Sequence, residues 1–399
     1  MSNAIKLSRC TPLIHQAYTR WGQNDKLINM ICMQMAGWLV GTESSQDRLG
    51  GNYPVRYVVD APPTGGQEKL LSTIMLERAS ELWNVGRPIN VFWSGGIDST
   101  AMLVALMMTN NNWNNQLHIT TTQRSITEEY PKFFEDYLSG SNVTVVDGDR
   151  MLHRDFYSDD EVNLTGDLAD QLFGSGFSQR YVGQFDKAQL HTPLAQIRSQ
   201  LFERATTIGT SRLNTVTRWP RHRVTNVLPH INSLSLSIQL THLVSEDQFL
   251  TWVDNHLSRA PFKLNTLYDM MWWLNFTLKW TEKKYRLVGI LGDSSIEPSA
   301  SVFFDTPDFQ WWSMTHHHEK IQPSDWKTYK QPLKDFIFSF TNDDQYRTNK
   351  TKEVSLMHTL EPINGIGQNM VTYWDTNGLL LTRPNTVVPA SAMRSVCNL

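Results

Sequence analysis

Alternation of short apolar segments with amphipathic segments is the feature that most restricts the fold of this 399-residue chain. The predicted strands are 89–93, 116–120, 143–146 and 162–164, and the predicted helices are 67–85, 98–108 and 127–138. Strands that alternate with helices predict a parallel sheet with right-handed crossovers. We therefore expect an α/β fold with a doubly wound, parallel, five-stranded sheet.

The first predicted helix has a clear apolar stripe. It consists of Leu70, Leu71, Ile74, Met75, Ala79 and Leu82. This spacing predicts an amphipathic helix with one apolar face.

Pattern and composition divide the chain into four predicted parts. Residues 1–62 form a small N-terminal segment that ends at a break rich in Pro and Gly, and residues 63–185 carry the sheet. Residues 186–345 are predicted to form a helical lobe. Residues 346–399 form a C-terminal segment, in which strands around the turn 375–378 predict a β-hairpin.

Charge and cysteine content exclude several protein classes. The formal net charge is −3, so an overall basic surface for nucleic acid is absent. No apolar run approaches the 18 residues of a membrane-spanning helix. Cys10, Cys32 and Cys397 lie far apart, which argues against a zinc site or a disulfide framework and favours a reduced, cytoplasmic location.

The loop after the first predicted strand has the composition of an anion-binding turn. Residues 94–99 read Ser-Gly-Gly-Ile-Asp-Ser. Gly95 and Gly96 allow backbone N–H groups to approach a phosphate, and the following helix directs its positive end there. Ser94 and Ser99 can donate hydroxyl hydrogens. Asp98 would repel a phosphate unless a cation such as Mg²⁺ lay between them, so the loop predicts a metal–nucleotide site.

Two other interpretations of the loop bear on this prediction. The loop has neither the GxxxxGK[ST] pattern of a Walker A motif nor the GxGxxG pattern of dinucleotide-binding folds. An ordinary turn from strand to helix, in which Ser and Asp only cap the helix, is the structural alternative.

Residues 94–99 resemble the PP-loop of the N-type ATP pyrophosphatases, which have an adenine nucleotide alpha hydrolase-like fold. Members of this superfamily cleave ATP between its α and β phosphates, adenylate an oxygen of the substrate and let a nucleophile displace AMP. The resemblance implies that the cofactors are ATP and Mg²⁺. It places the nucleotide against Ser94, Gly95, Gly96, Asp98 and Ser99.

A second motif narrows the resemblance to asparagine synthetases. Residues 165–174, Thr-Gly-Asp-Leu-Ala-Asp-Gln-Leu-Phe-Gly, resemble the family segment SGEGSDELFGG. The resemblance implies that Asp98 and Asp170 bind the metal and that Thr165 and Gly166 approach the nucleotide. Asp167 stands where the family has a Glu that acts as acid or base. From the residues alone, the alternative interpretation of Asp167 and Asp170 is a pair of acids at a helix N-terminus.

Two later segments extend the resemblance. Residues 301–309 resemble the family's PFLD segment, and residues 346–352 lie where the family has an Arg and a catalytic Lys. Lys350 and Lys352 are therefore both candidates for the catalytic lysine, and Asp167 is the third candidate catalytic residue. A solvated, charged loop is the alternative interpretation of the two lysines.

The resemblance implies an ATP-dependent, AMP-forming ligase that adenylates a carboxylate and forms an amide bond. Ser2 stands where glutamine-using relatives expose a Cys after removal of Met1, and only 93 residues precede Ser94. We therefore expect ammonia or an amine as the nitrogen donor, rather than glutamine. The expected partners are a small carboxylate and this nitrogen donor, with no membrane.

Two alternative functions stay open. The first is a PP-loop enzyme that modifies a nucleobase in tRNA or DNA. Its binding surface would be a basic stretch comprising Arg198, Arg204, Arg212, Arg218, Arg221 and Arg223, which otherwise predicts a solvated loop. The second is a non-catalytic nucleotide-binding protein, favoured by the bulky Leu168 and Ala169. His316–His318 is predicted to be a surface loop rather than a metal cluster, because consecutive residues rarely face one ligand.

Overall fold

The computed structural model describes residues 62–146, 157–158, 160–174, 191–202, 245–280, 300–322 and 325–351, and the strands at 372–375 and 378–381. All three cysteines, Lys352 and most of the predicted N-terminal segment lie outside these residues. So do all the arginines of the basic stretch except Arg198.

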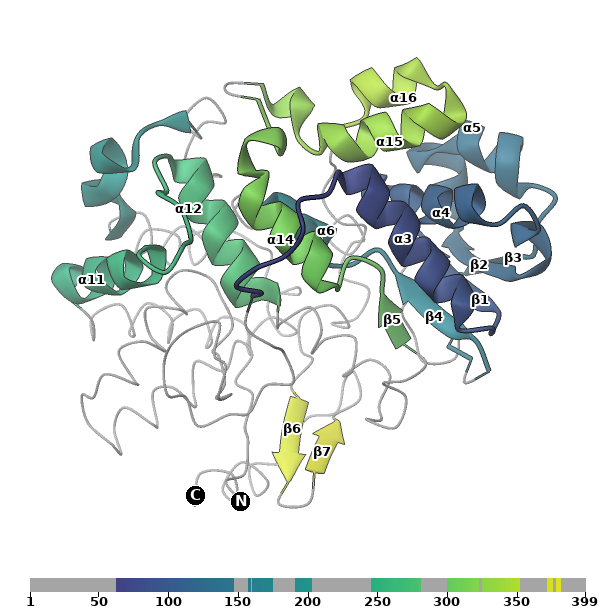
Figure 1. The fold of residues 1–399 in the computed structure, drawn as a ribbon, viewed down its shortest axis with the longest axis horizontal. Helices are drawn as coiled ribbons and strands as arrows, with labels where there is room; N and C mark the ends of the chain where they lie inside the picture. Colours follow the sequence, from purple (N-terminus) through teal and green to yellow (C-terminus); the bar gives the residue numbers. More distant parts are fainter. Residues whose placement is uncertain are drawn as a thin grey trace, which may run out of the picture.

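A five-stranded parallel sheet forms the centre of the described fold, which confirms the predicted fold class (Figure 1). Its order is β3-β2-β1-β4-β5, and the strands are β1 (Ile89–Trp93), β2 (Leu117–Thr122), β3 (Val143–Val146), β4 (Val162–Thr165) and β5 (Ala300–Val302). In the central register, Val91 pairs with Ile119 and with Leu164. The four strands located from the sequence all lie in this sheet. The sequence did not locate β5, whose three residues are too short to show a periodicity.

Two helices adjacent to β1 agree closely with the sequence. Helices α3 (Leu71–Asn84) and α4 (Ile97–Thr109) pack against each other, and both lie beside the sheet in Figure 1. Leu70, which belongs to the predicted stripe, precedes α3 as its N-cap and is 68% exposed. Helix α4 is buried on nearly all sides because α3 and a C-terminal helix also cover it.

The third predicted helix is interrupted. Instead of one helix over 127–138, a π-helical turn (Ser125–Glu129) is followed by the short α5 (Pro131–Phe133) and a second π-helical turn (Phe134–Leu138). Tyr130 leaves the helical conformation with ψ of 68°, as expected for a residue that precedes a proline. This break places Glu129 against the loop that follows β1.

Most of the other described elements are helices. They include α6 (Ala169–Phe173), α11 (Glu246–Leu257), α12 (Leu267–Leu274), α14 (Pro307–Thr315), α15 (Gln331–Thr341) and α16 (Asp344–Asn349). Residues 194–202 are also helical, and the described residues contain one further π-helical turn (Asn275–Lys279) and 3₁₀ turns at Trp113–Asn115, His317–Glu319 and Trp326–Thr328. Helix α16 spans residue 345, at which the sequence interpretation separated the lobe from the C-terminal segment.

The strands β6 (Thr372–Asp375) and β7 (Gly378–Leu381) pair antiparallel. They lie within the stretch for which the sequence predicts strands around a turn.

Trp272 of α12 fixes the position of α6, which follows β4. Its side chain is fully buried, and its indole N–H donates to the Leu172 carbonyl at 2.9 Å. Gly174 ends α6 with φ of 80°, and a Cβ there would lie 2.7 Å from the Trp272 Cβ. Asn275 donates to the carbonyl of Asp170 at 2.8 Å. The helical lobe thus holds the backbone of the second metal-candidate aspartate in place.

Two buried histidines predict how stability depends on pH. Burial lowers the pKa of His256 to about 3 and that of His317 to about 4, from a usual value of 6.5. At pH values between its lowered pKa and 6.5, each histidine is neutral in the folded protein and protonated in the unfolded chain. Unfolding therefore takes up protons, and stability falls as pH falls. Each histidine should account for roughly 3 kcal/mol of this loss, since one pKa unit corresponds to about 1.4 kcal/mol.

Urea unfolding at several pH values from about pH 7 to pH 4 measures this loss. His256→Gln should make the free energy of unfolding depend less steeply on pH. His318→Gln, at an exposed histidine, is the control. A His256→Gln variant with the same pH slope as the wild-type protein would show that folding does not shift the pKa of His256.

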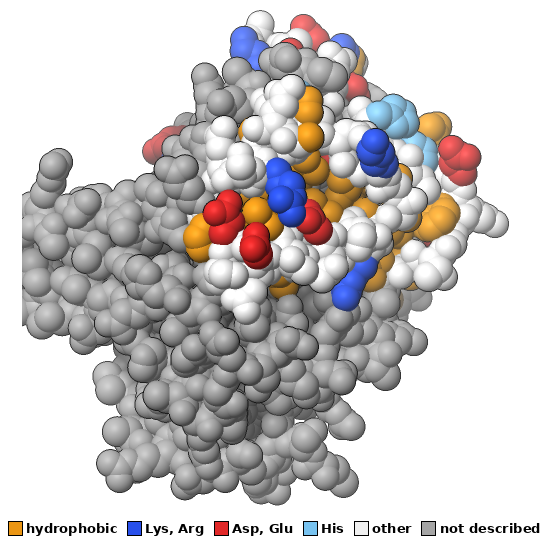
Figure 2. Space-filling view, turned by 90° about the vertical axis from the view of Figure 1, so that its left-hand side faces the viewer, with side chains coloured by type: hydrophobic (Ala, Val, Ile, Leu, Met, Phe, Trp, Pro, Cys, Tyr) orange, Lys and Arg blue, Asp and Glu red, His pale blue; other side chains and the backbone are white. Residues whose placement is uncertain are grey.

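No helix among the described residues is both long and apolar enough to cross a membrane. In Figure 2, the described part of the visible face shows basic side chains scattered among acidic ones. Arg198 forms an ion pair with Asp254 at 2.5 Å.

Candidate functional site

The loop after β1 has a backbone that requires glycine. Gly95 has φ of 71°, a conformation that side chains with a Cβ rarely adopt. A Cβ on Gly95 would also lie 2.6 Å from the Glu129 Cβ. Gly96 is the N-cap of α4, and no side chain caps this helix. The first N–H groups of α4 have no partner within the helix, so the loop can present them to an anion.

The two serines of the loop hold its shape. The backbone N–H of Ser94 donates to the Ser99 hydroxyl at 3.1 Å, and the two hydroxyl groups lie 3.0 Å apart. The Ser99 hydroxyl also contacts the Gly96 carbonyl at 3.3 Å. In this conformation the serines cross-link the loop, so their hydroxyl groups support its geometry before any ligand binds.

The end of β4 touches the start of α4. A Cβ on Gly166 would lie 3.0 Å from the Ser99 nitrogen and 3.2 Å from the Asp98 carbonyl carbon, so only glycine fits without a backbone shift. The preceding residue, Thr165, is buried, and its hydroxyl has no hydrogen-bond partner among the described residues. Gly166 therefore lies directly against the loop, and the buried Thr165 precedes it.

Sheet topology places this contact where ligands bind in parallel α/β folds. β1 lies between β2 and β4, so the chain leaves the carboxyl ends of β1 and β4 toward opposite edges of the sheet. Such a switch point opens a crevice beyond the strand ends, in which ligands bind. The loop 94–99 follows β1 and the segment 166–168 follows β4, so both predicted motifs flank this point.

Lys330 joins the two candidate metal ligands. Its ammonium group donates to Asp98 Oδ1 and to Asp170 Oδ1, at 2.6 Å in the second case. Its side chain is only 1% exposed, whereas those of Asp98 and Asp170 are 24% and 30% exposed. Burial lowers the pKa of Lys330, and the Asp98 carboxylate opposes that shift. The two carboxylates are thus close enough for one cation to contact both.

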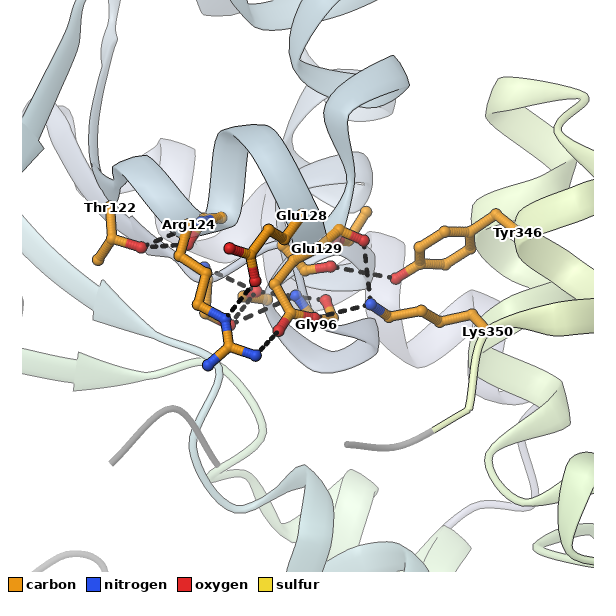
Figure 3. A network of polar contacts seen from close by, with 12 residues as sticks. Gly96, Thr122, Arg124, Glu128, Glu129, Tyr346 and Lys350 are labelled. Atoms are coloured by element: carbon orange, nitrogen blue, oxygen red, sulfur yellow. Dashed lines mark hydrogen bonds and ion pairs between the residues drawn. The ribbon is translucent and has the colours of Figure 1, made fainter. Parts of the chain in front are cut away.

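Lys350 lies on the opposite side of the glycine loop. Its ammonium donates to the Glu129 carboxylate at 2.8 Å and to the Glu129 carbonyl at 3.0 Å. Figure 3 shows Glu129 between Arg124 and Lys350, with Tyr346 beside them. The Tyr346 hydroxyl reaches the Gly95 carbonyl at 3.5 Å, and its ring stacks on Tyr130 at 3.8 Å.

Helices α15 and α16 bring both lysines to the sheet. Lys330 directly precedes α15 and Lys350 directly follows α16, and α15 packs against α4. Tyr130 donates to Asp343 at 3.2 Å, which anchors the start of α16 to the segment after β2. The C-terminal helices therefore complete a site that begins in the sheet.

Asp167 lies in the turn between β4 and α6 and is partly buried. The next residue, Leu168, has φ of 74°, which glycine adopts without strain. The asparagine-synthetase segment that residues 165–174 resemble has glycine at this position. Leu168 itself is buried, which offsets part of the strain through packing.

The structure brings most of the predicted residues together. Ser94, Gly95, Gly96, Asp98, Ser99, Thr165, Gly166 and Asp170 surround the junction of β1, β4 and α4, and Lys350 borders the glycine loop. Lys352 lies outside the described residues. Sequence reasoning missed Lys330 and Glu129. No local motif marks either residue, apart from Pro332, which indicates a helix start just after Lys330.

The predicted surface loop at His316–His318 is wrong for two of its three histidines. His316 is buried and stacks on Trp312, and His317 bonds to Asp269 at 2.7 Å. Only His318 is well exposed. The stretch forms the end of α14 and a 3₁₀ turn, which direct consecutive histidines to different surroundings. Across the described parts of the chain, no three His, Cys, Asp or Glu side chains gather as metal ligands do.

Comparison with known proteins gives no family assignment. The sequence matches no model of a known protein family, and no curated protein matches it. The site must therefore be interpreted from its own geometry.

The residues present fit a magnesium nucleotide. Mg²⁺ is usually held by one or two carboxylates together with phosphate oxygens, and Asp98 and Asp170 provide such a pair. Gly95 and Gly166 leave no room for a Cβ, and the Thr165 hydroxyl is buried without a described partner beside them. An uncapped helix N-terminus directs N–H groups toward the same place.

Gly166→Ala tests the close contact between β4 and α4. The new methyl group would meet backbone atoms of Ser99 and Asp98, so α4 must shift, at a cost of about 1–3 kcal/mol in stability. We expect a lower melting temperature and at least about tenfold weaker ATP binding, measured by calorimetry. Gly140→Ala is the control, because a Cβ there meets nothing within 4 Å. Equal ATP affinities for the two variants would contradict a nucleotide site at this contact.

Proposed function

We propose that this chain is an ATP-dependent, AMP-forming ligase that adenylates a carboxylate and forms an amide or related C–N bond. One observation carries the proposal. Two aspartates, from the glycine loop after β1 and from the turn after β4, converge on one cationic group at the sheet's switch point. Such convergence suits a metal that bridges phosphates at this point. The resemblance of residues 94–99 and 165–174 to asparagine synthetases supports the reaction class.

Each side chain has a role in this proposal. Asp98 and Asp170 hold Mg²⁺, which neutralises charge on the triphosphate when bound. The amides of the glycine loop and of the α4 N-terminus bind phosphate oxygens. Lys330 and Lys350 flank the loop and stabilise negative charge as pyrophosphate leaves. Asp167 lies where the asparagine-synthetase segment has its acid or base, so we assign it this role near the acyl group.

An assay with purified protein identifies the carboxylic acid and the nitrogen donor. Purified protein should be incubated with ATP, Mg²⁺ and a panel of carboxylic acids, with ammonia or amines, while AMP and pyrophosphate are measured. Acid-dependent release of both products supports a ligase, and release of ADP instead would reject it. Glutamine should not replace ammonia, and glutamate formed from glutamine would contradict this expectation.

A second candidate function has one specific observation in its favour. Because Lys330 already pairs with both aspartates, its charge offsets part of theirs without a metal. This arrangement also suits a protein that binds a nucleotide without catalysis. ATP binding without any AMP formation across the acid panel would favour it.

A further inference from the structure

We infer that Lys330 is a built-in counter-ion that excludes divalent cations from the Asp98–Asp170 pair until a nucleotide phosphate draws its ammonium group away. The inference deepens the proposed function, and only its nucleotide half rests on that function. It assigns to the site an order of loading, in which the metal enters together with the nucleotide.

The geometry makes the lysine and a metal competitors. The Lys330 ammonium contacts one oxygen of each carboxylate, and these are the oxygens that a shared cation would use. A divalent ion within about 4 Å of an ammonium group is strongly repelled, because both are cations in a largely desolvated place. One of them must leave for the other to bind tightly.

Burial shows from which side each group comes. The lysine side chain is almost fully enclosed, whereas both carboxylates keep about a quarter of their surface open. Solvent and ligands therefore reach the carboxylates, and the ammonium approaches them from the protein interior. An incoming phosphate on the open side can attract the ammonium, since phosphate oxygens are strong acceptors for Lys.

The backbone of Lys330 is held by contacts that do not involve its side chain. Its N–H donates to the Lys320 carbonyl at 3.1 Å, and its φ of 60° places it as the N-cap of α15. The Lys330 carbonyl accepts from Leu333 at 3.1 Å. The flexible stem of lysine can then move the ammonium without unfolding the helix.

Binding of Mn²⁺ to the nucleotide-free, full-length chain tests the inference. Wild-type protein should bind Mn²⁺ weakly in electron paramagnetic resonance titrations, and Lys330→Met should bind it at least about tenfold more tightly. Mn²⁺ should also raise the melting temperature of Lys330→Met more than that of wild type. Lys334→Met is the matched control, because Lys334 is a buried lysine of the same helix that bonds to the Lys327 carbonyl.

A double variant and a milder substitution complete the design. Asp98→Asn in the Lys330→Met background should remove the gained site, and a persistent gain would place the metal elsewhere and overturn the inference. Lys330→Gln removes the charge but keeps a donor, and it should show the same gain if Lys330→Met is poorly folded. The inference would also be overturned if wild-type protein bound Mn²⁺ as tightly as Lys330→Met and Lys330→Gln do.

ATP calorimetry on wild-type protein separates this inference from the proposed function. Tight Mg²⁺-dependent ATP binding without any Mn²⁺ gain in the lysine variants would reject the counter-ion role alone. A Mn²⁺ gain without ATP binding would support the exclusion of the metal by Lys330 and reject the nucleotide site.

Discussion

Asp98→Asn and Asp170→Asn should each reduce Mg²⁺-dependent pyrophosphate release by about a thousandfold or more, while the fold persists. Asparagine has the shape of aspartate but no charge, so the metal loses one of its two anionic ligands. The fold should persist because Lys330 keeps its ion pair with the other aspartate and the asparagine oxygen can still accept from its ammonium group. Release of pyrophosphate at limiting and at high Mg²⁺, with the acid found active in the panel, measures the effect.

The concentration of Mg²⁺ separates a metal ligand from a structural residue. High Mg²⁺ should restore part of the lost rate in both variants, since the remaining carboxylate still binds the ion. Asp136→Asn is the control, because Asp136 is exposed and pairs only with Lys132 among the ion pairs described. Turnover close to wild type at limiting Mg²⁺ in either variant would show that the metal is held elsewhere.

Lys350→Ala should lower turnover by about 10²–10³-fold with a small change in ATP affinity. Lys350 borders the glycine loop and carries a charge that can stabilise pyrophosphate as it leaves. This interaction is stronger in the transition state than in the bound substrate, so kcat should fall more than KM rises. Steady-state kinetics with varied ATP measure both quantities.

Two further variants define the role of Lys350. Glu129→Gln should cost only about tenfold, because Glu129 positions the lysine through one ion pair and one carbonyl contact. Lys352→Ala is the control and should keep near wild-type turnover. A large loss in Lys352→Ala with a small loss in Lys350→Ala would identify Lys352 as the catalytic lysine.

Local patterns were sufficient for most of the sheet. The strands β1 to β4 and the helices α3 and α4 follow from alternating apolar segments, because each is long enough to show its own period. The strand β5 and the interruption at Tyr130 did not follow from this pattern. Three residues carry no period, and the break depends on the proline that follows Tyr130.

The sequence by itself determined which side chains are available near the ends of β1 and β4. The composition of residues 94–99 and 165–170 predicts an anion-binding turn with three acids nearby, since glycines, hydroxyl groups and carboxylates are adjacent along the chain. The two motifs meet because β1 and β4 are parallel neighbours in the sheet. Alternation of strands and helices predicts a parallel sheet, but it does not predict which strands are neighbours.

Only the tertiary structure decided which cations complete the site. Lys330 is 232 residues from Asp98, and Lys350 is 221 residues from Glu129. No local signal links such distant residues, because their contact depends on α15 packing against α4 and on α16 stacking beside the loop after β2. An ion pair is determined by distance in space, and the folded core sets that distance.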